Sequence, residues 1–341
     1  MKLLIITDDK VGQRPDGRLT AQLATTRLRL LVAYHAARSA GFTAWLAVRH
    51  KPADLIGSDA FRDADTVLFG KTFEDHSATA LAAKQAGKRV LVDIADGLGS
   101  TGDFDELGRV AACADAVFCS SARLTEMAAA WVPADCRRFC IEEPAEEAIR
   151  APKAQLGGDG ILELLWFGTS RNIVYLVPHL SEIAALAEDR PFRITLVCHE
   201  NVVAQQLCAA AAEQDQGLFK IRFEEWTPQV QAAALDATDI VLIPGDLAKD
   251  SAQKSPNRLI NTIAAGRLAV ASPIPSYLPF ADFALIRDCL ADGIRDALAM
   301  PAADLEARIG AGQRVVAERY SAAEIGRHWI AAFQALGSER P

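Results

Sequence analysis

The chain has 341 residues, of which 50% are hydrophobic and 23% are charged, a composition that excludes a disordered protein. The net charge of −8 argues against a nucleic-acid partner held by overall positive charge. At roughly 150 residues per domain the length predicts two domains, and no stretch reaches the roughly 20 apolar residues of a membrane-spanning helix.

Apolar runs alternate with helical patterns along the first part of the chain, which predicts βαβ units and a parallel sheet. The first run, residues 3–7, is too short for a signal peptide and is followed by acids, so it is assigned to a strand. The predicted strands are 3–7, 43–48, 66–69, 89–93, 116–119 and 138–141, and the clearest helices are 19–39, 73–86 and 122–131. Residues 1–145 are therefore predicted to form an N-terminal Rossmann-like domain.

Composition changes after this region, because residues 142–160 carry acids, prolines and glycines without apolar periodicity and are typical of a linker. The alternation then restarts, with strands at 162–168, 193–198, 220–223, 239–243, 268–272 and 283–286 and a helix at 172–187. Residues 155–320 are therefore predicted to form a second doubly wound domain. The predicted fold class is α/β, with two Rossmann-like parallel-sheet domains facing a cleft in which ligands bind.

The seven cysteines are odd in number and scattered, which favours buried thiols in a reducing compartment and hence a cytoplasmic location. The six histidines are also scattered and form no metal-binding pair at helical spacing. We expect each histidine to be a surface residue or a satisfied core residue.

The stretch from Lys254 to Gly266, KSPNRLINTIAAG, places polar side chains directly before an apolar helix. Ser255 is a favoured N-cap residue and Pro256 is favoured at the first helical position. The preceding loop follows a strand, and open α/β sheets bind ligands at the carboxyl ends of their strands. A helix N-terminus flanked by Lys254 and Arg258 suits phosphate. The alternative is a capped surface helix with solvated cations.

Two stretches, LLWFGTSRN and KSPNRLINTIAAGRLAVASPIPSY, resemble the GT-B glycosyltransferases, particularly the retaining group that includes bacterial polysaccharide and cell-surface enzymes. Weaker similarities lie in TTRLRL, VLFGKTF, KRVLVDIADG and ADAVFCSSARLTE. The resemblance implies that the second domain holds a nucleotide-sugar donor and the first holds the acceptor. It also implies that the last helix, 321–341, packs back on the first domain.

Carried over to this chain, the resemblance assigns the donor diphosphate to two cations, Arg171 and Lys254, which would act in catalysis. The other expected donor-binding residues are Gly168, Thr169, Ser170, Ser255, Asn257, Arg258 and Asn261. No metal or other cofactor is expected, because these cations take the place of a metal.

The chain departs from the pattern of this group at two positions. Many members carry paired glutamates, whereas the corresponding residues here are Gln253 and Asn261. Neutral amides are weaker acceptors than carboxylates. Either the donor ribose is held differently, or the donor differs, or activity is lost.

Other charged motifs are less specific. The sequence Gly70-Lys71-Thr72 mimics the end of a P-loop but lacks the earlier glycine, and Lys71 is a candidate acceptor contact. The acids of 103–105 mimic a metal-binding Asp-x-Asp motif but also suit the start of a helix. Asp8 and Asp9 follow the first strand and could reach the cleft, but we expect them to be exposed loop carboxylates.

The remaining candidates lie on one helix and one strand of the first domain. Arg27 resembles an arginine that often follows a small hydroxyl residue in this group, and the alternative is a surface charge with a salt-bridge partner. Arg27, Arg29 and Arg38 share a predicted helix that could contact anionic lipid. Asp93 and Asp96 end a strand and are candidate carboxylates of the cleft, although we assign no catalytic base.

The sequence thus predicts a metal-independent glycosyltransferase, a hexosyl- or related transferase, in bacterial cell-surface polysaccharide synthesis. The partners would be a nucleotide-sugar donor and a saccharide, lipid-linked or protein acceptor, with no nucleic acid and with peripheral contact at the inner membrane face as an open possibility. Two alternatives remain: a sugar-nucleotide epimerase and a non-catalytic binding or scaffold protein of the same fold.

Overall fold

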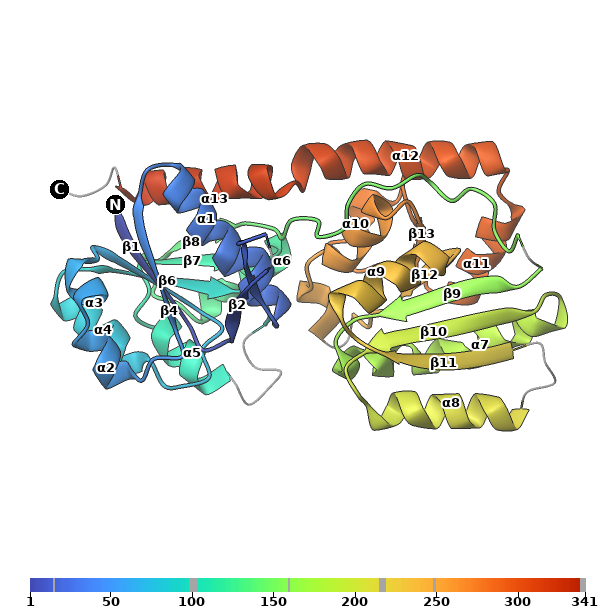
Figure 1. Ribbon diagram of the computed structural model, residues 1–341, viewed down its shortest axis with the longest axis horizontal. Helices are drawn as coiled ribbons and strands as arrows, with labels where there is room; N and C mark the ends of the chain where they lie inside the picture. Colours follow the sequence, from blue (N-terminus) through green and yellow to red (C-terminus); the bar gives the residue numbers. More distant parts are fainter. Residues whose placement is uncertain (15, 98–103, 159, 215–218, 248–249, 338–341) are drawn as a thin grey trace. The chain divides into compact units, whose positions relative to one another are not determined.

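Each half of the chain builds its own layered α/β unit (Figure 1). The computed structural model describes residues 1–14, 16–97, 104–158, 160–214, 219–247 and 250–337. Unit 1 consists of Met1–Pro144, Gln253–Ser255 and the chain from Tyr320 onward. Unit 2 consists of Ala145–Ala252 and Pro256–Arg319.

The sheet of unit 1 is parallel, with the strand order β4-β1-β5-β6-β7-β8. Its strands are β1 (Lys2–Thr7), β4 (Thr43–Val48), β5 (Thr66–Gly70), β6 (Arg89–Ile94), β7 (Ala116–Cys119) and β8 (Arg137–Cys140). The central strands are continuous apolar runs because helices cover both of their faces.

Two helices cover one face of this sheet, and the others pack on the opposite face. The helices are α1 (Leu31–Ser39), α2 (Pro52–Ile56), α3 (Asp59–Asp63), α4 (Ser77–Gln85), α5 (Phe104–Ala111), α6 (Ala122–Met127) and α13 (Ala322–Gly337). Helices α1 and α13 share the first face, where the rings of Trp329 and Phe118 lie 4.6 Å apart. Residues 322–337 therefore complete the core of unit 1 (Figure 1).

The sheet of unit 2 is also parallel, with the order β11-β10-β9-β12-β13-β14. Its strands are β9 (Leu162–Phe167), β10 (Phe192–Cys198), β11 (Phe219–Glu225), β12 (Ile240–Ile243), β13 (Leu268–Ala271) and β14 (Leu285–Ile286). Its α-helices are α7 (Leu180–Ala184), α8 (Val202–Gln214), α9 (Pro228–Ala237), α10 (Asn257–Ala264), α11 (Leu290–Ala299) and α12 (Ala302–Arg319). One core cluster joins α7, α8, α11 and α12 to alternate residues of the strands.

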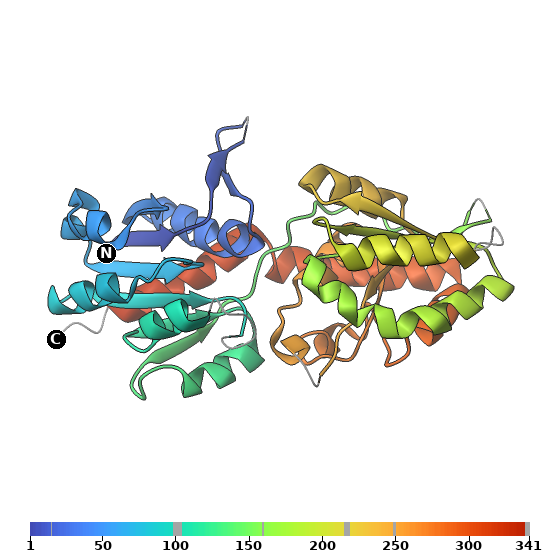
Figure 2. The ribbon, with the colours of Figure 1, turned by 90° about the horizontal axis from the view of Figure 1, so that it is seen from below.

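The predicted α/β class with two doubly wound parallel sheets is confirmed, and the helices show the differences. Residues 19–39 do not form one helix: β3 (Leu19–Ala21) pairs with β2 (Val11–Gln13), and a π-helical turn, η1 (Thr26–Leu30), precedes α1. Figure 2 shows this hairpin projecting from unit 1. The predicted helix 172–187 is broken into short 3-10 turns and α7, because Pro178 cannot continue a regular helix.

A search of the described helices for a membrane span finds none that combines sufficient length with sufficient hydrophobicity.

Candidate functional site

The strand order of unit 2 reverses between β9 and β12, because the chain leaves β9 for β10 on one side and returns to β12 on the other. In doubly wound sheets such a reversal opens a crevice at the carboxyl ends of the strands, where ligands bind. Gly168 follows β9 and Pro244 follows β12, so these two residues mark the carboxyl ends of the strands at the reversal in unit 2.

The side chain of Arg258 lies at this reversal. Its Cδ lies 3.4 Å from the position that a Cβ on Gly168 would take, and its Nη2 lies 3.5 Å from the carbonyl oxygen of Pro244. Its Nη1 is buried and has no hydrogen-bond partner among the described residues. A guanidinium with an unmet donor at the carboxyl ends of parallel strands is suited to a phosphate or carboxylate.

Gly168 has φ of 150°, in the region that favours glycine, and Arg258 packs against the space where a side chain would begin. Replacing Gly168 with alanine is expected to strain the backbone by about 1 to 3 kcal/mol and to displace the Arg258 side chain. Thermal unfolding and anion binding should both be measured. A Gly310→Ala variant is the matched control, because no atom lies within 4 Å of the Cβ position at Gly310. Equal effects of the two substitutions would contradict the prediction.

The other predicted residues after β9 lie on a 3-10 helix, η3 (Ser170–Tyr175), rather than at the start of an α-helix. Thr169 occupies the N-cap position without a side-chain cap, and Arg171 is exposed at the first turn. The backbone N–H groups of Ser170 and its neighbours thus start only a short turn. The assignment of these residues to a donor stays a prediction.

Asn261 holds the start of unit 2 together. Its Oδ1 accepts hydrogen bonds from the backbone N–H groups of Glu146 and Glu147, at 2.7 and 3.0 Å, and its Nδ2 donates to Oδ1 of Asn257. The side chain is buried, with 1% of the residue exposed. Because both ends of this amide are engaged within the protein, we leave Asn261 out of the proposed donor site.

The segment Gln253–Ser255 belongs to unit 1 and is held there by three polar contacts. Ser121 Oγ donates to the carbonyl of Gln253 at 2.7 Å, and Lys254 Nζ lies 3.0 Å from Oδ1 of Asp96. Ser255 Oγ donates to Oε2 of Glu143 at 2.5 Å. Burial raises the pKa of Glu143, while the charge of Arg29 and the Ser255 hydrogen bond partly offset that rise.

The predicted cap of the helix after this segment is wrong. Helix α10 begins at Asn257, Pro256 is its N-cap residue, and no side chain caps it. Ser255 does not cap because its hydroxyl donates to the buried Glu143. The side-chain amide of Gln253 packs over Gly97. A Cβ atom added to Gly97 would lie 2.0 Å from Nε2 of Gln253.

Arg29 and Asp93 form a fully buried ion pair in unit 1. Arg29 donates through Nε and Nη2 to both carboxylate oxygens, and its Nη1 donates to the carbonyl of Ile141. Burial opposes the charge of Arg29, but Asp93 outweighs burial and raises the pKa of the guanidinium. Asp93 is therefore a structural partner of Arg29.

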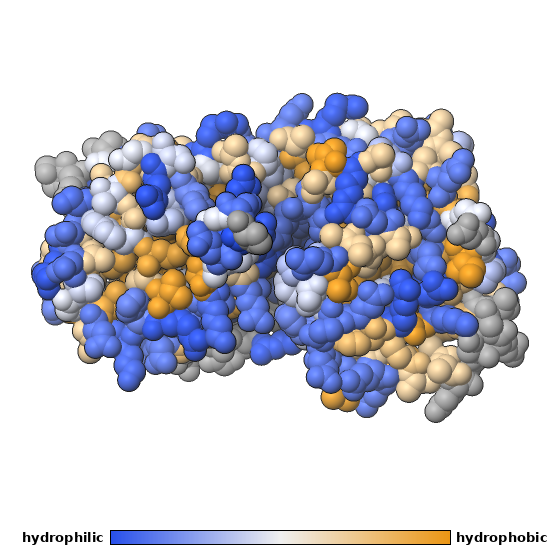
Figure 3. Space-filling model, in the orientation of Figure 1, coloured by the Kyte–Doolittle hydropathy of each residue, from blue (hydrophilic) through white to orange (hydrophobic). Residues whose placement is uncertain are grey.

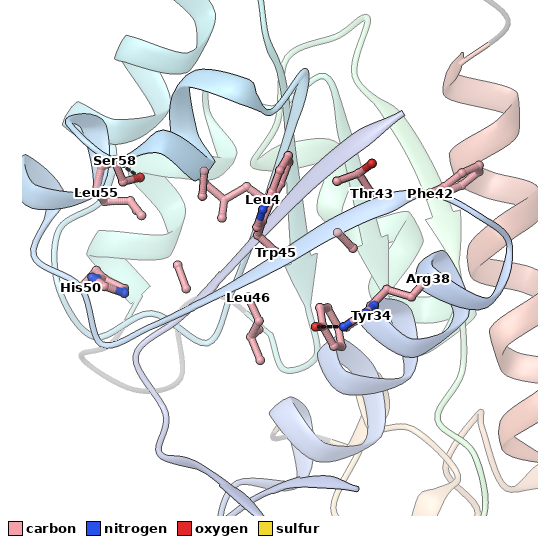
Figure 4. A pocket seen from close by; sticks show the side chains of 13 residues that line it. Leu4, Tyr34, Arg38, Phe42, Thr43, Trp45, Leu46, His50, Leu55 and Ser58 are labelled. Atoms are coloured by element: carbon pink, nitrogen blue, oxygen red, sulfur yellow. Dashed lines mark hydrogen bonds between the residues drawn. The ribbon is translucent and has the colours of Figure 1, made fainter. Parts of the chain in front are cut away.

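Two of the three arginines predicted to contact lipid, Arg27 and Arg29, are buried, so the prediction is wrong for these two. Arg27 is 9% exposed and donates to the carbonyls of Ala21 and Gln22, while Arg29 is 0% exposed. The π-helical turn η1 directs both side chains inward. Arg38, which is exposed, lies over the Tyr34 ring beside a cavity of about 620 Å³ along β4 (Figure 4).

This cavity follows β4, an edge strand of the unit 1 sheet, from Phe42 before the strand to His50 just beyond its carboxyl end. It is lined on both sides of β4, by Trp45, Leu46 and His50 among others, as Figure 4 shows. Hydrophobic residues reach the surface in the region of β4 (Figure 3).

The strand order of unit 1 reverses between β1 and β5, and Asp8 lies at that point. Asp8 and Asp9 are buried, at 8% and 5% exposure, so the expectation of exposed carboxylates is wrong. Asp8 Oδ2 accepts from the backbone N–H groups of Phe73 and Glu74, and Asp9 Oδ2 accepts from that of Leu23. Both carboxylates therefore hold the adjacent loops in place through backbone hydrogen bonds, and these bonds compensate for their burial.

His76, which the sequence analysis did not single out, is fully buried beside Asp8. Its Nε2 lies 3.3 Å from Asp8 Oδ1, and its Nδ1 has no partner within the described part of the chain. Burial would raise the pKa of Asp8, but His76 and the two N–H groups outweigh burial and lower it. Lys71, in the same loop, has φ of 33°. Asp103, half of the candidate metal motif, lies outside the described residues.

No protein-family model matches the chain, and no curated protein matches it. Solved structures do match. The apo structure of OtsA has a TM-score of 0.69 at 11% identity and covers 100% of both chains. Anabaena Alr3699/HepE in complex with UDP-glucose has a TM-score of 0.69 at 13% identity, over 98% of this chain and 100% of that chain.

A third similar structure is described as trehalose-6-phosphate from E. coli bound with UDP-2-fluoro glucose, with a TM-score of 0.67 at 12% identity over 99% and 100% of the two chains. These are GT-B structures, so the predicted GT-B fold is confirmed. At this identity the similarity establishes the fold and not the activity.

Proposed function

We propose that the protein is a glycosyltransferase that transfers a sugar from a nucleoside diphosphate-sugar to an acceptor. The observation that carries this proposal is the Arg258 guanidinium at the strand reversal of unit 2, with its Nη1 unpartnered among the described residues. A diphosphate presents anionic oxygens that can accept a hydrogen bond from this unpartnered N–H group. Fold neighbours described with UDP-glucose and UDP-2-fluoro glucose support a nucleotide-sugar donor.

In this proposal the protein's cations take the place of a metal. Lys254 and Arg171 neutralise the charge that develops on the diphosphate as the bond to the sugar breaks. Gly168, Thr169 and Ser170 allow the backbone to approach the phosphates. The transferred unit is a hexose or a related sugar. The acceptor is a saccharide, a lipid-linked group or a protein, and the reaction belongs to the synthesis of a bacterial cell-surface glycan.

Isothermal titration calorimetry tests the donor site. UDP, GDP, TDP and CDP are titrated in EDTA into the wild type, Arg258→Ala and Arg295→Ala. The last is a matched control, because Arg295 is an exposed arginine of unit 2 paired with Asp292. We expect one nucleotide to bind the wild type and the control, and to bind the Arg258 variant at least about tenfold more weakly, as expected for loss of a charge-assisted hydrogen bond.

Turnover is then followed as release of the nucleoside diphosphate from the matching sugar donor, with candidate acceptors present. Transfer of the sugar supports the proposal. Nucleotide binding with no turnover on any acceptor would identify a scaffold, and release of a free epimer would identify an epimerase. Failure of every nucleotide to bind would overturn the proposal at its donor site.

A further inference from the structure

Lys254, the cation proposed to neutralise the leaving diphosphate, already has an anionic partner in unit 1. Its Nζ lies 3.0 Å from Asp96 Oδ1. The backbone on either side is fixed, because Ser121 holds the carbonyl of Gln253 and Ser255 donates to Glu143. The ammonium group is therefore presented from an anchored segment, and Asp96 accounts for its position.

The pair is open to solvent. The Lys254 side chain is 29% exposed and that of Asp96 is 54% exposed. Ion pairs of this kind contribute little to stability, so a ligand can separate the two groups without disturbing the fold. The Arg29–Asp93 pair nearby is different, since both of its side chains are 0% exposed and cannot meet a ligand.

Asp96 lies among charges of both signs, with the cations Lys254, Lys71 and Arg29 on one side of the balance and the buried acids Asp93 and Glu143 on the other. Although the side chain is half exposed, partial desolvation by the surrounding protein would raise the pKa of its carboxyl, but the charges of Lys254, Lys71 and Arg29 outweigh this and lower it. Asp96 consequently remains an anion at neutral pH.

We propose that Asp96 is an internal counter-ion that competes with the donor diphosphate for Lys254. In the empty protein the carboxylate neutralises the ammonium group, and a diphosphate displaces it because the diphosphate carries more charge. A monophosphate carries less charge and competes less well, so the pair also discriminates between the two. This inference rests on the proposed function, because it assigns Lys254 to the donor.

The experiment compares Asp96→Asn, which removes the charge and keeps the shape, with the wild type. Each protein is titrated with the nucleoside diphosphate that binds in the calorimetric screen above and with the corresponding monophosphate. We expect the variant to bind the diphosphate about 3- to 10-fold more tightly and to lose part of its preference for diphosphate. In a Lys254→Ala background the same substitution is expected to change diphosphate affinity less than about twofold, because the competition is gone.

Asp59→Asn is the matched control. Asp59 lies in an exposed pair with Arg62 on α3, which precedes β5 and lies toward the amino ends of the strands. Its removal changes the net charge equally and is expected to leave affinity unchanged. Far-UV circular dichroism confirms that each variant is folded.

Weaker or unchanged diphosphate binding by Asp96→Asn would overturn the inference, since the carboxylate would then position Lys254 or play no part. An equal gain in the presence and absence of Lys254 would also overturn it, because the effect would then be general repulsion. If wild type and Asp96→Asn both fail to bind any nucleotide, the proposed function fails as well, which distinguishes the two failures.

Discussion

Lys254→Ala is expected to lower kcat about 100- to 1,000-fold, the range observed when one preorganised group that stabilises transition-state charge is removed. The loss should fall mainly on kcat, because the charge on the diphosphate develops as the sugar bond breaks. Steady-state release of the nucleoside diphosphate measures it. The fold should be retained, since the substitution removes a solvent-open ion pair with Asp96.

Lys84→Ala provides the matched control for this variant. Lys84 is a half-exposed lysine of unit 1 that pairs with Asp115, as Lys254 pairs with Asp96. It lies in the last turn of α4, toward the amino ends of the strands. A loss of less than tenfold for Lys254→Ala, or an equal loss for Lys84→Ala, would contradict the catalytic assignment.

Arg29→Ala is expected to lower the free energy of unfolding by about 3 to 5 kcal/mol, because it leaves the buried carboxylate of Asp93 without a partner. Arg29 also makes a hydrogen bond to Ile141 and lies 5.7 Å from the ring centroid of Trp329, so its packing is lost as well. Urea titration followed by circular dichroism measures the change.

The double variant Arg29→Met with Asp93→Leu separates charge from packing. Replacing both partners of a buried ion pair with apolar side chains is often neutral or stabilising, so most of the lost stability should return. Destabilisation by the double variant equal to that of Arg29→Ala would show that the hydrogen bond to Ile141 and the side-chain shape matter more than the charge pair.

The strands could be predicted from the sequence because their signal is local. Continuous apolar runs such as LLIIT in β1 and AVFC in β7 are long enough for a strand and too short for a helix. The helix boundaries were harder to predict, because local hydrogen bonds decide where each helix begins and ends. Pro178 lies in a 3-10 turn inside a predicted helix, and Pro256 is the N-cap residue of α10 rather than its first helical residue.

The pairing of charged residues could not be predicted in the same way. Arg29 and Asp93 are separated by 64 residues, and Ser255 and Glu143 by 112, so no local pattern contains both partners. A usable signal was present, since Asp93 interrupts the buried run VLVDI and a charge there requires a partner. The sequence places Arg29 among leucines in the same way, but it does not say which acid Arg29 meets.

The return of α13 to unit 1 has a consequence for the order in which the protein folds during synthesis. The face of the first sheet that carries Leu3, Ile5 and Phe118 packs against Trp329 and Phe333. Residues 1–144 leave the ribosome long before residues 322–337 exist, so this apolar face must wait through the synthesis of all of unit 2. Nascent chains of unit 1 are thus expected to need chaperone protection until the last helix emerges.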